Sequence, residues 1–220
     1  MTCQSASVLL CLMTRDLSAF KKEKEEAILE AALRIIKGKG FHRARMSDIA
    51  REANISYGLV YHYFKTKDDL FEAILYRWWD SLFQLMKDIN EAQSDVQMKL
   101  RRIIDYFLDT YQDNPALVNI FITEISRSTS NLTPDRLEYF KKFMSLTEAI
   151  IAEGQRNETL RKDFKARYLT YIFLGSLEAF ISTMVLADQN IKGNAQKKRI
   201  VESILEVFLN GAKIQQRKDN

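Results

Sequence analysis

The sequence predicts an all-α chain of about nine helices. Only 7 of the 220 residues are Gly and 2 are Pro, too few for a turn-rich β fold. Apolar residues recur at helical spacing from Phe20 to Gln216, interrupted only by short polar breaks. We therefore expect a flexible tail over residues 1–20, a small helical domain over 21–67 and a larger helical domain over 68–220.

The first twelve residues leave two interpretations open. The run Ser7–Met13 is apolar, but no basic residue precedes it and polar helix follows soon, which argues against an export signal. Either residues 1–12 are an extension ahead of a natural start at Met13, or they form an apolar tail that packs elsewhere. The only cysteines, Cys3 and Cys11, lie here and predict neither a disulfide framework nor a zinc site.

Three short helices are expected within residues 22–64. The first carries Ile28 and Ile35 on an apolar face and ends at Gly38 and Gly40. The second covers about residues 46–53 and the third residues 57–64.

The junction between the second and third helices has turn chemistry. Asn54 tolerates the left-handed backbone conformation, and Ser56 is a favoured cap for the helix that follows. Two short helices joined by a tight turn form a helix-turn-helix. Thr66 is then a plausible cap for a long helix that starts near Asp68 and extends beyond Leu85. Further helices are expected near residues 95–112, 115–127, 134–156, 164–188 and 195–216.

Positive charge is concentrated in the small domain. Between Arg34 and Lys67 the chain has eight basic and two acidic residues, a net charge of +6, whereas the whole chain carries +4. The remainder is therefore about −2. A basic segment of this kind is typical of a surface that binds phosphates.

The third helix divides into two faces. Val60 and Phe64 lie four residues apart and can join the core, whereas Tyr57 and Tyr61 lie on a different face. On that face Gly58 lets the backbone approach a partner closely, and the tyrosines can donate hydrogen bonds to bases or phosphates. The helix therefore presents one core face and one DNA-reading face.

The residues at fixed spacing here are Ile49-Ala50, Ala53-Asn54-Ile55-Ser56, Gly58, Val60-Tyr61, Tyr63-Phe64, Lys67 and Leu70. This pattern, over about residues 22–72, resembles the DNA-binding signature of the TetR (tetracycline-repressor) family. The resemblance implies a cytoplasmic, nucleoid-associated prokaryotic homodimer on palindromic double-stranded operator DNA, with residues 57–64 of each subunit in successive major grooves. It also implies that the remaining chain binds a small molecule and forms the dimer.

The resemblance assigns base contacts to Tyr57, Gly58 and Tyr61, and phosphate contacts to His62, Tyr63 and Lys67. Arg45 stands where the family usually has a capping hydroxyl, so either Ser47 caps one turn later or Arg45 contacts phosphate without capping. Leu59 replaces a common small hydroxyl residue and can instead contact a thymine methyl. The full set of expected DNA-binding residues is Arg45, Ser47, Ser56, Tyr57, Gly58, Leu59, Tyr61, His62, Tyr63, Lys65 and Lys67.

The second half of the chain is rich in aromatic residues at helical spacing, a pattern of a packed core that also suits an apolar cavity. Glu178 lies inside an apolar helix and so needs a partner, of which an ion pair is the simplest and a ligand group the alternative. The candidate ligand-binding residues are Phe107, Tyr111, Phe121, Glu124, Arg127, Phe143, Met144, Phe173 and Glu178.

The last two long helices are expected to form the dimer interface. Small residues spaced four apart allow a second helix to approach closely, and the final helix has a broad apolar face. Paired with the same helices of a second subunit, they would form a four-helix bundle. The expected interface residues are Gly175, Ala179, Thr183, Ile200, Ile204, Val207 and Phe208.

Phe121-Ile122-Thr123-Glu124 and Ile172-Phe173 through Glu178 resemble the fatty-acid-degradation regulators of the TetR family, which sense long-chain acyl-CoA. That resemblance implies a repressor released by acyl-CoA, with Arg127 near the anionic head group. Two alternatives are a multidrug-type repressor, in which Glu124 or Glu178 binds a cationic lipophile, and an architectural DNA-binding protein without a ligand. We expect no enzyme activity, metal, cofactor or membrane partner, because the sequence has no catalytic triad, zinc site, phosphate-binding glycine loop or run of 18 apolar residues.

Overall fold

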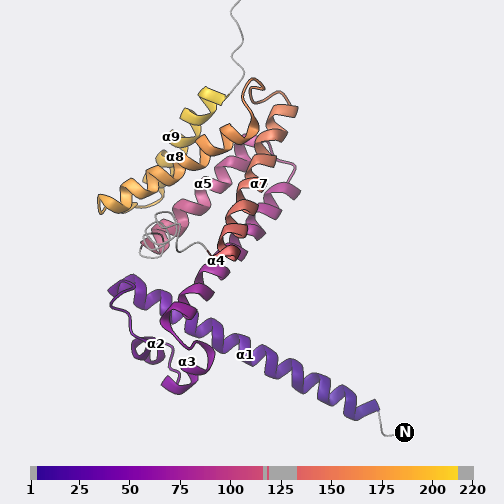
Figure 1. The fold of residues 1–220 in the computed structure, drawn as a ribbon, viewed down its shortest axis with the longest axis vertical. Helices are drawn as coiled ribbons and strands as arrows, with labels where there is room; N and C mark the ends of the chain where they lie inside the picture. Colours follow the sequence, from indigo (N-terminus) through magenta and orange to yellow (C-terminus); the bar gives the residue numbers. More distant parts are fainter. Residues whose placement is uncertain (1–3, 116–117, 119–132, 213–220) are drawn as a thin grey trace, which may run out of the picture. The chain divides into compact units, whose positions relative to one another are not determined.

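A computed structural model describes residues 4–115, 118 and 133–212. Over these residues the chain is all helical, with eight helices and no strand, which confirms the predicted fold class (Figure 1). The chain divides into two compact units, residues 1–77 and 78–220. The division falls inside a helix, after Arg77, whereas the sequence places the boundary after Lys67. The predicted helix over residues 115–127 lies almost entirely outside the described residues.

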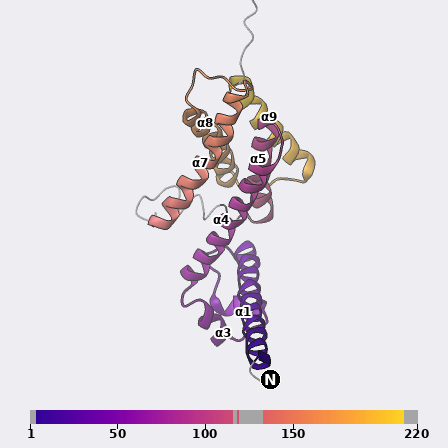
Figure 2. The ribbon, with the colours of Figure 1, turned by 90° about the vertical axis from the view of Figure 1, so that its right-hand side faces the viewer.

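The first unit contains α1 (Gln4–Lys39), α2 (Met46–Glu52), α3 (Tyr57–Tyr63) and the beginning of α4 (Lys67–Glu91) (Figure 2). The backbone of α1 is helical from Gln4 onward, in place of the flexible tail predicted for residues 1–20. No Gly or Pro occurs between Gln4 and Lys37, so the sequence contains no residue that would end the helix there.

The core of the first unit comes from one face of each helix. α1 packs on α2, and α2 packs on α3. Burial of these side chains fixes which face of α3 remains exposed. The buried apolar residues include Ile28, Ala32, Ile36, Ile49, Val60, Phe64, Leu70 and Ile74.

The turns of the first unit have the predicted chemistry. Asn54 has a φ of 53°, in the left-handed region. The Ser56 hydroxyl accepts a hydrogen bond from the Leu59 amide at 3.3 Å, which confirms the predicted cap of α3. At the start of α4 the Thr66 hydroxyl accepts from the Asp69 amide and the Asp69 carboxylate accepts from the Thr66 amide, each at 3.0 Å. This reciprocal arrangement satisfies two backbone donors at the end of the helix.

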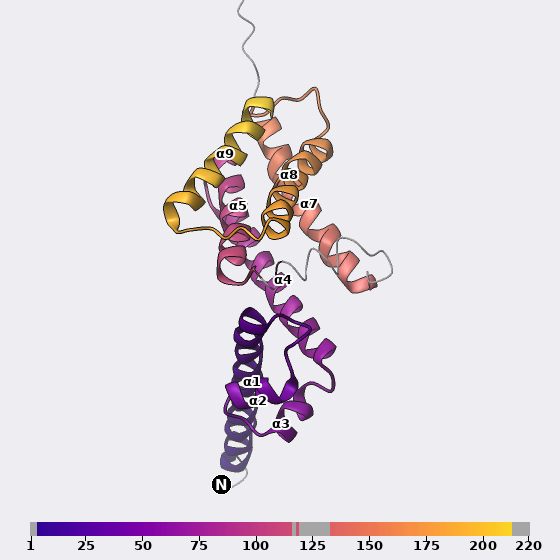
Figure 3. The ribbon, with the colours of Figure 1, turned by 90° about the vertical axis from the view of Figure 1, so that its left-hand side faces the viewer.

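The second unit contains the rest of α4 with α5 (Val96–Asp113), α7 (Pro134–Arg156), α8 (Ala166–Leu186) and α9 (Asn194–Ala212). α7 packs on α8, and α5 packs on α7, α8 and α9. In Figure 3, α5 is seen between α9 and α8, and α8 and α9 are also in contact with each other. Thr133 caps α7, and Pro134 occupies its first turn as predicted.

Two lysines form ion pairs that join α5 to its neighbours. The ammonium of Lys99, which is buried, lies 2.8 Å from a carboxylate oxygen of Glu153 on α7. Lys197 of α9 lies 2.6 Å from Asp109 and 3.7 Å from Asp105, both on α5. These contacts fix α5 between α7 and α9.

Candidate nucleic-acid interface and the surfaces of the second unit

The solvent-facing side of α3 is polar and aromatic. Tyr57 is 53% exposed, and Gly58 and His62 are also exposed, whereas Val60 is fully buried. The rings of Tyr57 and Tyr61 pack against each other with their centroids 4.7 Å apart. The structure therefore shows the two-faced helix that the sequence predicts.

The two tyrosines are also joined through their hydroxyl groups. A hydrogen bond with Tyr61, helped by desolvation, raises the pKa of Tyr57 above its ordinary value. The phenol therefore donates its single O–H to Tyr61. While that bond is made, Tyr57 can offer a DNA partner its oxygen as an acceptor and its exposed ring for apolar contact.

Gly58 lies beside these rings. A Cβ atom added at Gly58 would meet no other atom within 4 Å. Packing inside the described residues therefore does not require a glycine here. A requirement for glycine would have to come from a partner that approaches the backbone of α3.

Internal ion pairs use part of the positive charge of this unit. Arg34 pairs with Glu52 at 2.7 Å, and Asp48 pairs with both Lys39 at 3.0 Å and Arg51 at 2.8 Å. The remaining cations of the segment include four exposed side chains for which the described residues give no acidic partner. These four are Lys37, Arg43, Arg45 and Lys65.

The start of α2 decides between the two interpretations of Arg45 and Ser47. Arg45 occupies the N-cap position, and its side chain makes no capping hydrogen bond. Ser47 lies inside the helix, which begins at Met46, so the alternative in which Ser47 caps α2 is wrong. The exposed side chains of Arg45 and Ser47 remain candidates for phosphate contact.

Lys67 makes contacts that the sequence does not predict. Its ammonium donates hydrogen bonds to the carbonyl oxygens of Phe41, at 3.0 Å, and His42, at 3.4 Å. It also lies 4.4 Å from the centroid of the Phe41 ring, a cation–π contact. These partners lie 25 and 26 residues away along the chain, so no local pattern could reveal them. The phosphate contact expected of Lys67 stays a prediction.

The other residues assigned to DNA are positioned as follows. Leu59, Tyr61 and Tyr63 are half-buried, and Ser56 is exposed while its hydroxyl caps α3. The rings of His62 and Tyr63 are in edge contact, with centroids 5.7 Å apart. The candidate DNA-binding surface of the first unit therefore consists of α3, the start of α2 and the residues that follow α3.

The candidate ligand-binding residues do not form one group in the second unit. Phe107 of α5 and Phe143 of α7 are in contact, with ring centroids 5.7 Å apart. Phe173 instead contacts Phe208 of α9 at 5.2 Å, and the Tyr111 hydroxyl donates to the carbonyl of Gln189. Met144 is half-buried on α7, and Phe121, Glu124 and Arg127 lie outside the described residues.

Glu178, for which the sequence predicts an ion pair or a ligand group as partner, lies on the surface of α8. It is exposed, and its carboxylate accepts a hydrogen bond from the Ser182 hydroxyl at 3.3 Å. The inward positions of α8 include Phe173, Leu177 and Ile181. Glu178 follows Leu177 directly and so projects about 100° away from it around the helix.

The candidate dimer residues divide between the surface and the core. Gly175, Ala179 and Thr183 are exposed on α8, and Val207 is 76% exposed on α9. Ile200, Ile204 and Phe208 are buried within the subunit and therefore belong mainly to its own core. From the sequence alone, the broad apolar face of α9 does not reveal which of its side chains pack inside the subunit and which remain exposed.

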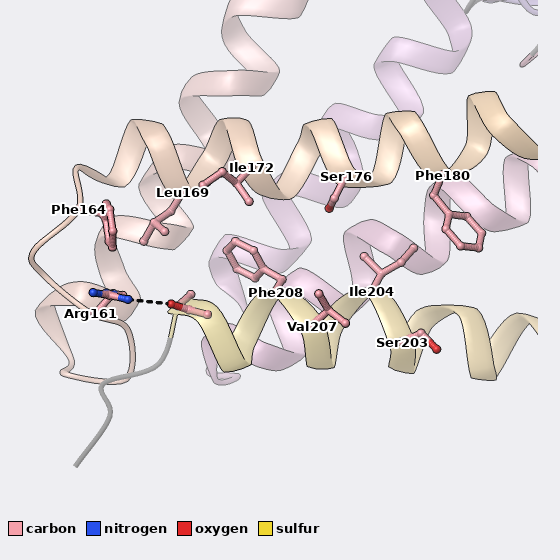
Figure 4. Close-up of a pocket in the computed structure, with 12 residues that line it drawn as sticks. Arg161, Phe164, Leu169, Ile172, Ser176, Phe180, Ser203, Ile204, Val207 and Phe208 are labelled. Atoms are coloured by element: carbon pink, nitrogen blue, oxygen red, sulfur yellow. Dashed lines mark hydrogen bonds between the residues drawn. The ribbon is translucent and has the colours of Figure 1, made fainter. Parts of the chain in front are cut away.

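A groove of about 500 Å³ runs between α8 and α9 (Figure 4). Ile172 and Phe180 of α8 lie on one side of it and Val207 of α9 on the other. At one end, Arg161 donates a hydrogen bond to the carbonyl of Gly211 at 3.2 Å. None of the candidate ligand-binding residues that the structure describes lines this groove.

The apolar surface continues beyond the groove. A second hollow of about 480 Å³ shares Phe180 and Ser203 with it.

By length and composition α8 could also cross a membrane, with a mean hydropathy of 1.6. A helix that packs one side into a protein core and has an apolar outer side meets the same criteria of length and hydropathy. We therefore interpret α8 as a core helix whose outer face is apolar and exposed. Among the described residues no group of three or more His, Cys, Asp or Glu side chains could hold a metal ion.

Comparison with known proteins identifies both units. Residues 28–74 match the model of bacterial regulatory proteins of the tetR family, and residues 79–210 match the model of the C-terminal region of YsiA-like proteins. The chain is 22% identical over 191 residues to the fatty acid metabolism regulator protein of Bacillus subtilis, covering 87% of this chain and 96% of that protein.

Two solved structures share the fold. The fatty acid degradation regulator FadR from Bacillus halodurans has a TM-score of 0.68 and 24% identity, covering 86% of this chain and 95% of that one. FadR from Bacillus subtilis in complex with stearoyl-CoA has a TM-score of 0.67 and 23% identity, covering 84% and 98%. The chain therefore belongs to the tetR family of bacterial transcriptional regulators, with a YsiA-like C-terminal region.

Proposed function

We propose that the protein is a homodimeric repressor that binds a palindromic operator and is released from it by a long-chain acyl-CoA. The observation that carries this proposal is the match of residues 79–210 to the YsiA-like region, together with the fold that the chain shares with a FadR bound to stearoyl-CoA. The steps of the mechanism follow from the contacts of the described residues.

The operator is read by α3. Its exposed side carries Tyr57, Gly58 and His62. Arg45, before α2, and Lys65, after α3, have no acidic partner among the described residues. The cations would neutralise phosphates and set the register, while Tyr57 would reach base edges in the major groove.

The dimer is formed through the outer face of α8 and α9. Exposed apolar side chains such as Ile172 and Val207 lie along this face, beside the small residues Gly175 and Ala179. Covering such a face with the same face of a second copy removes apolar surface from water. A twofold dimer would place the two α3 helices in successive major grooves, about 34 Å apart.

The effector would act on α4. The rings of Phe107 and Phe143 contact Trp78 and Trp79 of α4, respectively, with centroids 5.6 and 6.3 Å apart. Tyr106 of α5 also donates a hydrogen bond to the Trp78 carbonyl at 3.1 Å. An acyl chain that enters among these rings would have to move them, and with them α4.

α4 continues through the division between the two units into the DNA-binding unit. A displaced α4 would change the spacing of the two α3 helices and lower the affinity for the operator. Arg127, outside the described residues, is our candidate for the anionic head group.

A gel shift with DNA from upstream of the protein's own gene, at about 150 mM salt, tests the proposal. A specific protein–DNA complex that dissociates on addition of stearoyl-CoA, but not on addition of CoA or free stearate, would support the proposal. A specific complex that ignores acyl-CoA would refute the ligand class and turn the search to cationic or aromatic lipophiles. Binding without sequence preference would instead favour an architectural DNA-binding protein.

A further inference from the structure

We infer that Lys67 positions the α1–α2 loop, residues 40–45, and so acts on DNA binding through that loop and not as a phosphate ligand. An exposed lysine after α3 could extend toward a phosphate of the DNA backbone. Lys67 is half-buried, and its ammonium is directed at the loop.

The donors of Lys67 are already used. An ammonium has three N–H groups. Three acceptors surround this one: the Phe41 carbonyl at 3.0 Å, the His42 carbonyl at 3.4 Å and the Phe41 ring at 4.4 Å. A phosphate would have to displace one of these contacts before it could bind Lys67.

The contacts of Phe41 hold the loop to the rest of the unit. Its carbonyl accepts from the Ala44 amide, at 3.2 Å, as well as from Lys67. Its ring lies 4.9 Å from that of Phe71, which is buried on α4. Gly40, with a φ of 77°, lets the chain turn out of α1 at this point. Lys67 therefore fastens the loop to the start of α4.

The loop carries two of the cations for which the described part of the chain gives no acidic partner. Arg43 lies within it, and Arg45 ends it at the N-cap of α2. If the loop is released, Arg43 and Arg45 lose the fixed backbone position from which their guanidinium groups extend. The effect of Lys67 on the operator thus passes through Arg43 and Arg45, and this part of the inference rests on the proposed DNA surface.

Hydrogen exchange on the free, full-length protein separates the two roles. In Lys67→Met we expect the Ala44 amide to exchange about tenfold faster, because a charged group that tethers the loop has been removed. Lys65→Met is the matched control, since Lys65 is exposed two residues earlier and has no described acidic partner. It should leave the exchange of Ala44 unchanged while reducing the salt slope of operator binding by about one.

A second variant keeps Lys67 in place. Phe41→Leu removes the ring face but retains an apolar side chain against Phe71, and it should also speed the exchange of Ala44. On operator DNA the losses from Lys67→Met and Phe41→Leu should be less than additive, because both loosen the same loop.

Unchanged exchange in Lys67→Met, or additive losses of operator affinity, would overturn the inference and restore Lys67 as a phosphate ligand. Failure of the wild-type protein to bind any operator is a different result. It would remove the proposed function, while the exchange measurement would still decide whether Lys67 fixes the loop.

Discussion

The ion pair between Lys99 and Glu153 is expected to respond unequally to the loss of either partner. The side chain of Lys99 is only 5% exposed, whereas that of Glu153 is 29% exposed. Glu153→Gln therefore leaves an ammonium that water can hardly reach, and we expect it to lower the free energy of unfolding by about 3 kcal/mol. Lys99→Met leaves a carboxylate that water can partly solvate, so we expect a smaller loss, about 1–2 kcal/mol.

Urea denaturation followed by tryptophan fluorescence measures this difference. Trp78 and Trp79 are the only tryptophans, and both lie in the second unit with the ion pair. The double variant Lys99→Met/Glu153→Gln removes both charges, so it should be more stable than Glu153→Gln alone. Equal losses in the two single variants, or a double variant less stable than either, would refute the reasoning.

Three further outcomes follow from the described contacts. Gly58→Ala should leave the protein as stable or up to about 1 kcal/mol more stable in thermal unfolding, because a Cβ fits in open space, yet weaken operator binding about tenfold. An operator affinity equal to wild type would show that DNA does not approach Gly58. Val207→Glu should convert the proposed dimer to a folded monomer in sedimentation with an unchanged helical spectrum, because it places a charge on the exposed apolar face; a dimer that persists would place the interface elsewhere. The pKa of the Asp48 carboxyl is lowered, chiefly by a hydrogen bond from Lys39, so its contribution to stability is present at neutral pH and is lost as the pH falls below about 4. Asp48→Asn should therefore lower the urea midpoint at pH 7 and converge with wild type at acid pH, as followed by circular dichroism; a gap that does not change with pH would contradict this.

The DNA-binding half was predictable from the sequence wherever the signal is local. The left-handed backbone of Asn54, the cap from Ser56 and the burial of Val60 depend on residues within one or two turns of each other. The family signature is made of the same short-range pattern. These features were therefore open to sequence reasoning, as was the fold class.

The features that sequence reasoning missed depend on distant residues. Lys67 is held by carbonyl groups of a loop that precedes the helix-turn-helix, and three of the eight basic residues counted in the segment are paired with acids. Glu178 was expected to need an ion pair or a ligand group because its neighbours in sequence are apolar. Several of those neighbours, such as Tyr171 and Ile172, are themselves exposed, so Glu178 lies at the surface. A helix that is apolar on both sides gives no sign of which side the same chain covers.

In the proposed mechanism, operator DNA and acyl-CoA each weaken the binding of the other to the protein. The most direct test is a titration of stearoyl-CoA, followed by the fluorescence of Trp78 and Trp79, into the free protein and into its operator complex. Reciprocal coupling predicts that the operator weakens stearoyl-CoA binding by the same factor by which stearoyl-CoA weakens operator binding. Equal affinity of stearoyl-CoA for the free protein and for the complex would contradict the account.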